Sequence, residues 1–241
     1  MFHNKKIVIA GGTGYIGQAM AARWSAGNEV VILTRNAHGK ADNTYGVRAD
    51  AAAARLAYWD ARHPGAWQQE LEGADVLINL AGRSVNCRYN EERKKEIMES
   101  RVDATRVLGE ALQSLKQPPV LWVNGASATI YRHADDRPQD EFTGDIENDF
   151  SVQVCKAWEK EFAQAATPHT RKAALRMAIV LGRGGVLVPY MRLVKAGLGA
   201  GTATAARCLA GYMKQIFAAS WNGCTTTRRR AVCIMLQLPA R

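Results

Sequence analysis

The sequence predicts an α/β fold built on a parallel, doubly wound sheet, and three observations lead to this prediction. Short apolar runs recur along the chain, stretches of helical composition lie between them, and a glycine-rich turn joins the first run to the first helical stretch. Strands that alternate with helices at this spacing are typical of βαβ units, whose strands run parallel. A chain of 241 residues can hold one large domain of this kind together with a smaller second part.

Each strand is predicted from an apolar, often β-branched run that is short enough to be buried on both faces of a sheet. The strands fall at residues 6–10, 29–34, 55–59, 75–80, 120–124 and 173–181. Helices are predicted between them, at residues 15–25, 65–72, 91–116 and 149–166. Gly27 and Asn28 stop the first helix, and Pro118 and Pro119 follow the long one. The order predicts one α/β domain over residues 1–181.

The composition is that of an ordinary globular protein, with 47% hydrophobic residues, 22% charged residues and a mean hydropathy of −0.22. Disordered and collagen-like classes are excluded by these values. No run approaches the ~18 apolar residues that a membrane span needs, and the start of the chain does not resemble a signal peptide. Five cysteines form no metal-binding or disulfide pattern, so we expect reduced thiols and a cytoplasmic location. The cysteines are Cys87, Cys155, Cys208, Cys224 and Cys233.

The net charge of +10 would ordinarily favour a partner such as nucleic acid, but its distribution argues against this. Residues 1–161 hold 20 basic and all 22 acidic residues, a net charge of −2. Residues 162–241 hold 12 basic residues and no acidic one, and the last acid in the chain is Glu161. The basic character belongs to the C-terminal third, so no nucleic-acid partner is predicted for the main domain.

The stretch "GGTGYIG" between the first strand and the first helix is the most informative motif. It has the spacing Gly-x-Gly-x-x-Gly inside a unit of about 30 residues, which is the context of a dinucleotide-binding turn. The glycines allow a tight turn and a close approach of backbone to a pyrophosphate, while the helix N-terminus offers free N–H groups and the positive end of its dipole. The alternative is a glycine-rich turn with no ligand. The predicted cofactor-binding residues of this turn are Gly11, Gly12, Thr13, Gly14, Tyr15, Ile16 and Gly17.

The residues after the second strand bear on which dinucleotide is bound. An NAD site usually has an acid there for the ribose 2′-hydroxyl, whereas this chain has Thr34 and Arg35. A guanidinium and a hydroxyl suit a 2′-phosphate, so NADP is favoured over NAD. The alternative is that Arg35 is a solvated surface residue.

Several motifs together resemble the atypical extended short-chain dehydrogenase/reductases of the NAD(P)-dependent epimerase/dehydratase family, and within it an epimerase-like subgroup filed as cell-division-inhibitor homologues. The motifs are "GGTGYIG", "LTR", "VLINLAG", "RKKEIMESRVDATR", "VCKAWE" and "IVLGRGG", spread over about residues 5–199. The resemblance implies a Rossmann domain that binds NADP, over residues 1–181, and a smaller C-terminal substrate portion, whose start is residues 182–199. It also implies cofactor contacts from Leu80, Ala81, Glu96, Arg101 and Val180. A solvated helix with i,i+4 ion pairs remains the alternative for the segment that holds Glu96 and Arg101.

The tyrosine and lysine that short-chain dehydrogenases use four residues apart are absent. Counted back from Glu159, the lysine position holds Cys155 and the tyrosine position holds Ser151. The candidates that remain are Ser127, which matches the position of the substrate-orienting hydroxyl in the wider superfamily, and Tyr131 close by. A serine at the end of a strand is also a common turn or cap residue. Ser127 and Tyr131 are therefore predicted catalytic residues, and no metal ligand is predicted.

Residues 200–241 do not continue the resemblance. A segment like "MFSWIH", a helix ending near "EWLY" and a strand near "GVYNA" are expected, but the chain gives an acid-free stretch with three consecutive arginines. When each codon of this stretch is taken from its third base, the expected segments become possible in the right order, with two glutamates required. We therefore predict an aberrant, out-of-frame tail over residues 200–241, in which the substrate-binding cap would be missing; a genuine divergent tail is the alternative.

Two functions follow from the sequence. One is an NADP-dependent epimerase or oxidoreductase that transfers a hydride to or from a small carbonyl, hydroxyl or sugar-nucleotide substrate, the cofactor supplying the difficult step. The other is an NADP-binding sensor without catalysis, which the missing tyrosine and lysine favour. The sequence leaves the substrate and the oligomeric state open.

Overall fold

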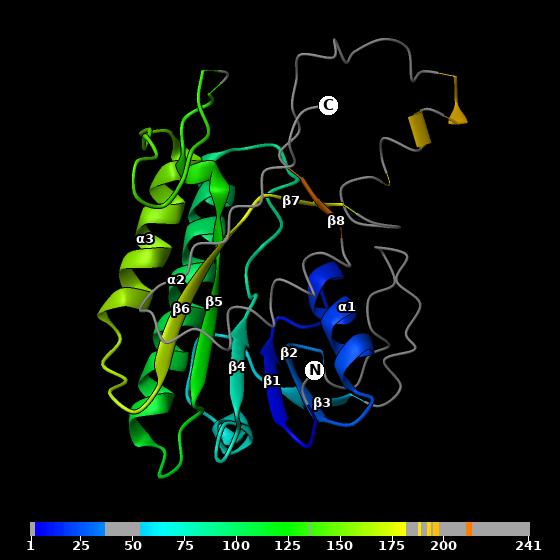
Figure 1. Cartoon of the computed structure of the whole chain (residues 1–241), viewed down its shortest axis with the longest axis vertical. Coiled ribbons are helices and arrows are strands. Elements are labelled where there is room, and N and C mark those ends of the chain that lie inside the picture. Colours follow the sequence, from blue (N-terminus) through cyan, green and yellow to red (C-terminus); the bar gives the residue numbers. More distant parts are fainter. Residues whose placement is uncertain are drawn as a thin grey trace.

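The computed structural model is an α/β structure in which one parallel sheet carries the helices (Figure 1). The structure describes residues 3–36, 54–134, 136–181, 188, 192–193, 195–197 and 211–213. The predicted substrate portion and out-of-frame tail lie largely outside these residues and stay predictions. No helix among the described residues is long and apolar enough to cross a membrane.

Six strands form the sheet in the order β3-β2-β1-β4-β5-β6, and every neighbouring pair is parallel. The order reverses direction at β1, because the chain first moves to one side through β2 and β3 and then returns to add β4. This is the order of a Rossmann-type doubly wound sheet, and the predicted fold class is confirmed. The strands are β1 (Lys6–Ala10), β2 (Glu29–Thr34), β3 (Arg55–Tyr58), β4 (Val76–Asn79), β5 (Leu121–Ser127) and β6 (Arg171–Met177).

Two core clusters lie on opposite faces of the sheet because successive strand residues point to opposite sides. Helix α1 (Tyr15–Trp24) packs on the face that holds Ile7 and Ile9. Helix α2 (Glu91–Ser114) and helix α3 (Phe150–Gln164) cover the face that holds Val8 and Ala10. The central strands are buried on both faces, which explains why they are continuous apolar runs in the sequence.

Two predicted elements differ from the observed ones. The strand expected at residues 173–181 is divided: β6 ends at Met177, and β7 (Ile179–Leu181) pairs with β8 (Gly211–Met213) in a separate two-stranded sheet. The helix expected at residues 65–72 is a short 3₁₀ turn, η2 (Ala66–Glu70). A second 3₁₀ turn, η3 (Ala128–Ile130), follows β5 directly.

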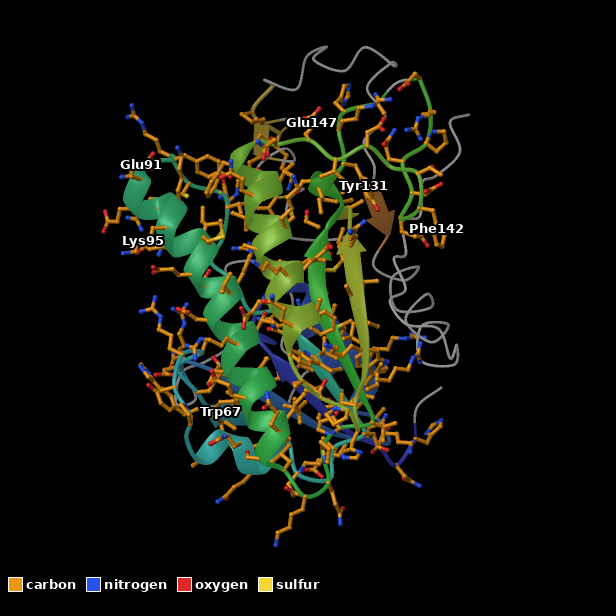
Figure 2. All side chains as sticks on the ribbon, turned by 90° about the vertical axis from the view of Figure 1, so that its left-hand side faces the viewer. Trp67, Glu91, Lys95, Tyr131, Phe142 and Glu147 are labelled. Atoms are coloured by element: carbon orange, nitrogen blue, oxygen red, sulfur yellow. The ribbon has the colours of Figure 1, made fainter. Side chains whose placement is uncertain are left out.

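The carboxyl ends of the strands gather at one end of the molecule. Figure 2 shows Tyr131, just beyond β5, at the same end as Glu91, where α2 begins, while Trp67 lies beside the opposite end of α2. Asn90 caps α2 by accepting a hydrogen bond from the Arg93 N–H, and Asp149 caps α3 in the same way through Val152. Both helices therefore start at the end of the sheet where ligands bind in open α/β folds.

Candidate functional site

A cavity of about 530 Å³ lies at the carboxyl ends of the strands. It joins the turn between β1 and α1 to the space between α2 and α3. Its lining comprises Gly11, Gly14, Tyr15, Ile16, Gly17, Leu80, Val85, Tyr89, Ile97, Arg101, Ala126, Ser127, Thr129, Phe150, Ser151, Val154, Cys155, Trp158, Met177, Ala178 and Val180. Most of the residues predicted at the sequence level are thus brought together in one cavity, although they come from five segments of the chain.

Two glycines of the turn, Gly11 and Gly17, have no room for a side chain. Gly11 has a φ of +72°, and a Cβ there would lie 2.8 Å from the Cα of Ala81 in the segment after β4. A Cβ on Gly17 would overlap the backbone of Gly12, so the first turn of α1 packs directly on the end of β1. These contacts require glycine, and they bring the backbone of the turn to the surface of the cavity.

The N-terminus of α1 opens onto the cavity without a side-chain cap. Gly14 is the N-cap residue, and no side chain among the described residues accepts a hydrogen bond from the N–H groups of the first turn. These N–H groups are therefore left for a ligand. The buried hydroxyl of Tyr15 has no hydrogen-bond partner among the described residues, and burial raises the pKa of this phenol. An uncapped helix start and an orphaned hydroxyl in one cavity fit the phosphates and ribose of a dinucleotide.

Arg101 is the only charged side chain among the described residues that line the cavity. Its guanidinium donates a 2.9 Å hydrogen bond to the carbonyl of Ile97 and lies 5.4 Å from the ring centroid of Trp158. Burial lowers the pKa of Arg101, and within the described part of the chain no carboxylate pairs with it. A desolvated cation without an acidic partner is a ready site for an anionic ligand group.

Glu96, which was predicted beside Arg101, has a different environment. Its carboxylate lies 3.1 Å from Arg83 and 3.3 Å from Arg93, and it is not part of the cavity lining. Glu96 thus connects the segment after β4 to the first turns of α2.

Thr34 and Arg35 lie at the end of β2, outside the cavity lining. Thr34 is buried, and its hydroxyl accepts a hydrogen bond of 3.2 Å from the N–H of Asn36. The Arg35 side chain is exposed. The two described residues directly after β2 are Arg35 and Asn36, so the guanidinium is the charged group between them.

A buried polar network, which was not predicted from the sequence, holds the strand ends beside the cavity. The amide of Asn79 donates to Asn124 Oδ1 at 2.7 Å and to Thr105 Oγ1 at 3.1 Å, and its carbonyl oxygen accepts from the N–H of Ala81. Trp158 Nε1 donates to the same threonine hydroxyl at 2.9 Å. The network joins β4, β5, α2 and α3, and it holds the Trp158 ring on which Arg101 rests.

Ser127 lies in the cavity as predicted, and it belongs to a row of small polar groups. Its hydroxyl is 2.9 Å from the hydroxyl of Thr129, which is 3.5 Å from the sulfur of Cys155. Burial raises the pKa of the Cys155 thiol, so the neutral thiol is favoured. Ser151 and Cys155 both line the cavity, at the positions where a tyrosine and a lysine were expected from the resemblance.

Tyr131 is held differently from Ser127. Arg176 donates a 2.5 Å hydrogen bond to the Tyr131 hydroxyl, and its guanidinium also lies 5.2 Å from the tyrosine ring centroid. The same guanidinium forms a two-pronged ion pair with Glu159, at 2.8 and 2.7 Å. Tyr131 is not part of the cavity lining, so the structure brings Ser127 but not Tyr131 to the cavity surface.

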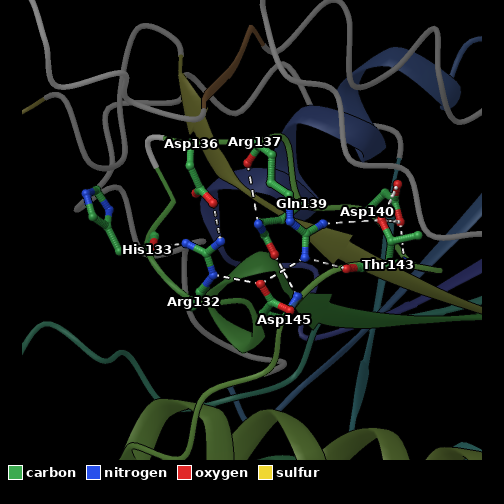
Figure 3. A network of polar contacts seen from close by, with 8 residues as sticks. All are labelled: Arg132, His133, Asp136, Arg137, Gln139, Asp140, Thr143 and Asp145. Carbon is green, nitrogen blue, oxygen red and sulfur yellow. Dashed lines mark hydrogen bonds and ion pairs between the residues drawn. The ribbon is translucent and has the colours of Figure 1, made fainter.

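The chain beyond Tyr131 forms a loop that is closed by the antiparallel bridge between Tyr131 and Ile146. Figure 3 shows its internal ion pairs: Arg132 lies 2.7 Å from both Asp136 and Asp145, and Arg137 lies 2.9 Å from Asp145. The Arg132 guanidinium lowers the pKa of Asp136 to about 2. These contacts brace the loop internally and place none of its charges in the cavity.

Several cavity residues were not predicted, above all the aromatic ones. Tyr89 and Phe150 form an edge-to-face pair with ring centroids 5.6 Å apart, and Trp158 lies deeper. The sequence signal for Phe150 was its place next to the Asp149 helix cap, which aims the first turn of α3 at the strand ends. Groups of three or more potential metal ligands are absent from the described residues.

A parallel sheet with a tight glycine-rich turn, an uncapped α1 and a cavity at the strand ends is typical of dinucleotide-binding Rossmann proteins. Residues 7–183 match the model of the NAD dependent epimerase/dehydratase family, and the chain belongs to this family. The resemblance seen in the sequence motifs is thereby confirmed.

Curated relatives support the assignment. The chain is 32% identical over 190 residues to the epimerase family protein SSP1921 of Staphylococcus saprophyticus, covering 78% of this chain and 60% of that one. It is 30% identical over 201 residues to the epimerase family protein YfhF of Bacillus subtilis, covering 81% and 63%. The chain thus spans about three fifths of the length of these relatives.

Solved structures share the fold. The human epimerase family protein SDR39U1, crystallised with NADPH, superposes with a TM-score of 0.74 at 24% identity, covering 94% of this chain and 72% of that one. A UDP-N-acetylglucosamine 4-epimerase from Methanobrevibacter ruminantium, in complex with UDP-N-acetylmuramic acid, gives a TM-score of 0.77 at 16% identity, covering 98% and 77%.

Proposed function

We propose that the chain binds NADP and transfers a hydride between this cofactor and a carbonyl or carbinol carbon of a small substrate. The observation that carries the proposal is the single cavity that joins the glycine turn to Ser127. A dinucleotide that lies across the strand ends would place its phosphates at α1 and its reactive ring toward the end of β5. The NADPH in the human structural relative is consistent with this cofactor.

The residues that would hold the cofactor come from four segments. The backbone of Gly11 to Gly17 receives the pyrophosphate, and Leu80 and Ala81 border the adenosine side, held by the Asn79 amide. Arg101 offers its unpaired charge to a phosphate or ribose oxygen. Arg35 is exposed at the end of β2, where a 2′-phosphate would distinguish NADP from NAD.

Ser127 is the residue placed to meet the substrate oxygen. Its hydroxyl, backed by Thr129, can donate a hydrogen bond to a carbonyl oxygen and so stabilise the charge that develops there. When bound, NADPH supplies the hydride for such a reduction. Tyr131 is a weaker candidate because its hydroxyl is occupied by Arg176.

A second function has an observation in its favour. Ser151 and Cys155 stand where a tyrosine and a lysine would exchange a proton with the substrate, and the Cys155 thiol has a raised pKa. A protein that binds NADP without turnover, and changes a partner interaction in response, would need neither of the missing groups.

The test has two stages. NADPH binding is followed by the change in its fluorescence, and saturable binding is expected; a chain that binds neither NADPH nor NADP⁺ would refute both functions. NADPH consumption is then measured with a panel of carbonyl compounds and sugar nucleotides for the parent chain, Ser127→Ala and Tyr131→Phe. Turnover that falls at least tenfold in Ser127→Ala supports hydride transfer at this site, whereas binding without turnover on the whole panel supports the sensor.

A further inference from the structure

We infer that the substrate of this cavity is a neutral, largely apolar or aromatic carbonyl compound or its alcohol, and not a sugar nucleotide. The inference deepens the proposed function and rests on it. It comes from the wall of the cavity between α2 and α3, which is the end away from the glycine turn.

This wall, the substrate wall, is built almost wholly from apolar and aromatic side chains. Two of its members stand exposed at the mouth: Val85 is 53% exposed and Tyr89 is 45% exposed. Aromatic rings continue inward from Tyr89 through Phe150, whose centroid is 5.6 Å away. The members are Val85, Tyr89, Ile97, Phe150, Val154, Trp158, Met177 and Ala178. Exposed apolar groups around a cavity mouth mark a surface that an apolar ligand covers.

The polar groups at this end are few, and besides the Tyr89 hydroxyl at the mouth they are small. Ser127, Thr129 and Cys155 already contact one another, at 2.9 and 3.5 Å, and Ser151 adds one more hydroxyl. Among the described residues of the cavity lining there is no carboxylate, carboxamide, histidine or lysine. A ligand oxygen can therefore be satisfied at Ser127, Ser151 or the Tyr89 hydroxyl, but the described lining offers few partners for a ring that carries several hydroxyls and a diphosphate.

Arg101, the one charged residue of the described lining, would be neutralised by the bound cofactor. Arg101 rests on Trp158 and lies beside Gly82, where an added Cβ would come within 3.0 Å of its guanidinium carbon. It thus adjoins the segment after β4 that borders the dinucleotide. A sugar nucleotide brings a second diphosphate, for which the described lining supplies no second cation.

The binding preference can be measured without turnover. The chain is first saturated with NADP⁺, which cannot reduce a ketone, and acetophenone and UDP-glucose are then compared by saturation-transfer NMR. Acetophenone is expected to bind at least tenfold more tightly than UDP-glucose. Equal or tighter binding of UDP-glucose would overturn the inference, and so would failure of acetophenone to bind to a chain that does bind NADP⁺. A chain that does not bind NADP⁺ fails earlier, at the proposed function.

Paired variants locate the binding. Val85→Ser/Tyr89→Ser changes two exposed residues of the substrate wall, so the fold should be retained, and the dissociation constant of acetophenone should rise about tenfold because apolar contact area is lost. The matched control is Val120→Ser/Tyr58→Ser, which removes a valine and a tyrosine that are 68% and 62% exposed but do not line this cavity. The control should leave acetophenone binding within twofold of the parent; equal losses in the two variants would refute the location.

Discussion

Replacing Arg101 by methionine separates a ligand-binding role of this residue from a structural one. The guanidinium is desolvated in the cavity wall, makes one hydrogen bond to Ile97 and has no acidic partner in the described part of the chain. A charge in this position weakens the free protein, because burial costs solvation that no ion pair returns. Methionine keeps the apolar stem against Trp158 and removes the charge.

Arg101→Met is expected to weaken NADPH binding without lowering the free energy of unfolding. Hydrogen bonds to charged groups contribute about 1.5–3 kcal/mol, so the loss of a phosphate contact should weaken NADPH binding by about 10- to 150-fold. The free energy of unfolding should stay level or rise by up to about 1 kcal/mol, since an unpaired desolvated charge is removed. NADPH titration and urea denaturation of Arg101→Met measure the two quantities.

A control variant and a refuting result complete this test. Arg106→Met lies on the same helix, where the guanidinium pairs with Glu110 at 2.9 Å and does not line the cavity. It should leave NADPH affinity within twofold of the parent. If Arg101→Met lowers stability by more than about 1 kcal/mol while NADPH affinity is unchanged, the residue is structural and the ligand-binding role is refuted.

Four further substitutions test other parts of the site. Gly17→Ala should lower the free energy of unfolding by more than about 2 kcal/mol in urea denaturation, because the added Cβ would overlap the backbone of the turn. Gly14→Ala should fold normally, because the nearest atom to its added Cβ lies 3.6 Å away, and it should lose NADPH affinity. Arg35→Ala should weaken NADPH binding by about 5- to 30-fold and leave NADH binding unchanged in parallel titrations, and equal losses would exclude a 2′-phosphate contact. Thr105→Val should cost about 1–3 kcal/mol of stability in the same assay, because the Trp158 N–H loses its buried acceptor.

The main architecture could be predicted because each cue was local. A strand that is buried on both faces is a short apolar run, the residues of a glycine turn are contiguous, and the stop signals Gly27 and Pro118 lie next to the helices that they end. The break between β6 and β7 could not be predicted, since residues 173–181 are one uninterrupted stretch of strand composition. Their separation depends on the partner of β7, which is β8, more than thirty residues later in the chain.

The residues of the site could be predicted only where a contiguous motif, such as the glycine turn, contains them. In the buried network, Asn79 contacts Thr105, 26 positions later, and Asn124, 45 positions later. Nothing in the sequence around these polar residues indicates that they contact one another. The sequence also could not predict which side chains point into the cavity. Ser127 and Tyr131 are four residues apart, yet only Ser127 faces the cavity, because the tyrosine hydroxyl is held by Arg176.

Ser151 and Cys155, at the positions where the resemblance implies a tyrosine and a lysine, also affect the charge of the cavity. A tyrosine and a lysine in these places would add a phenol and a second cation to the cavity, whereas Ser151 and Cys155 leave Arg101 as its only charge among the described residues. A cavity with one cation holds one anionic ligand well, and once a dinucleotide has neutralised Arg101 the remaining wall is apolar. The cofactor and the substrate should therefore occupy different halves of the same cavity.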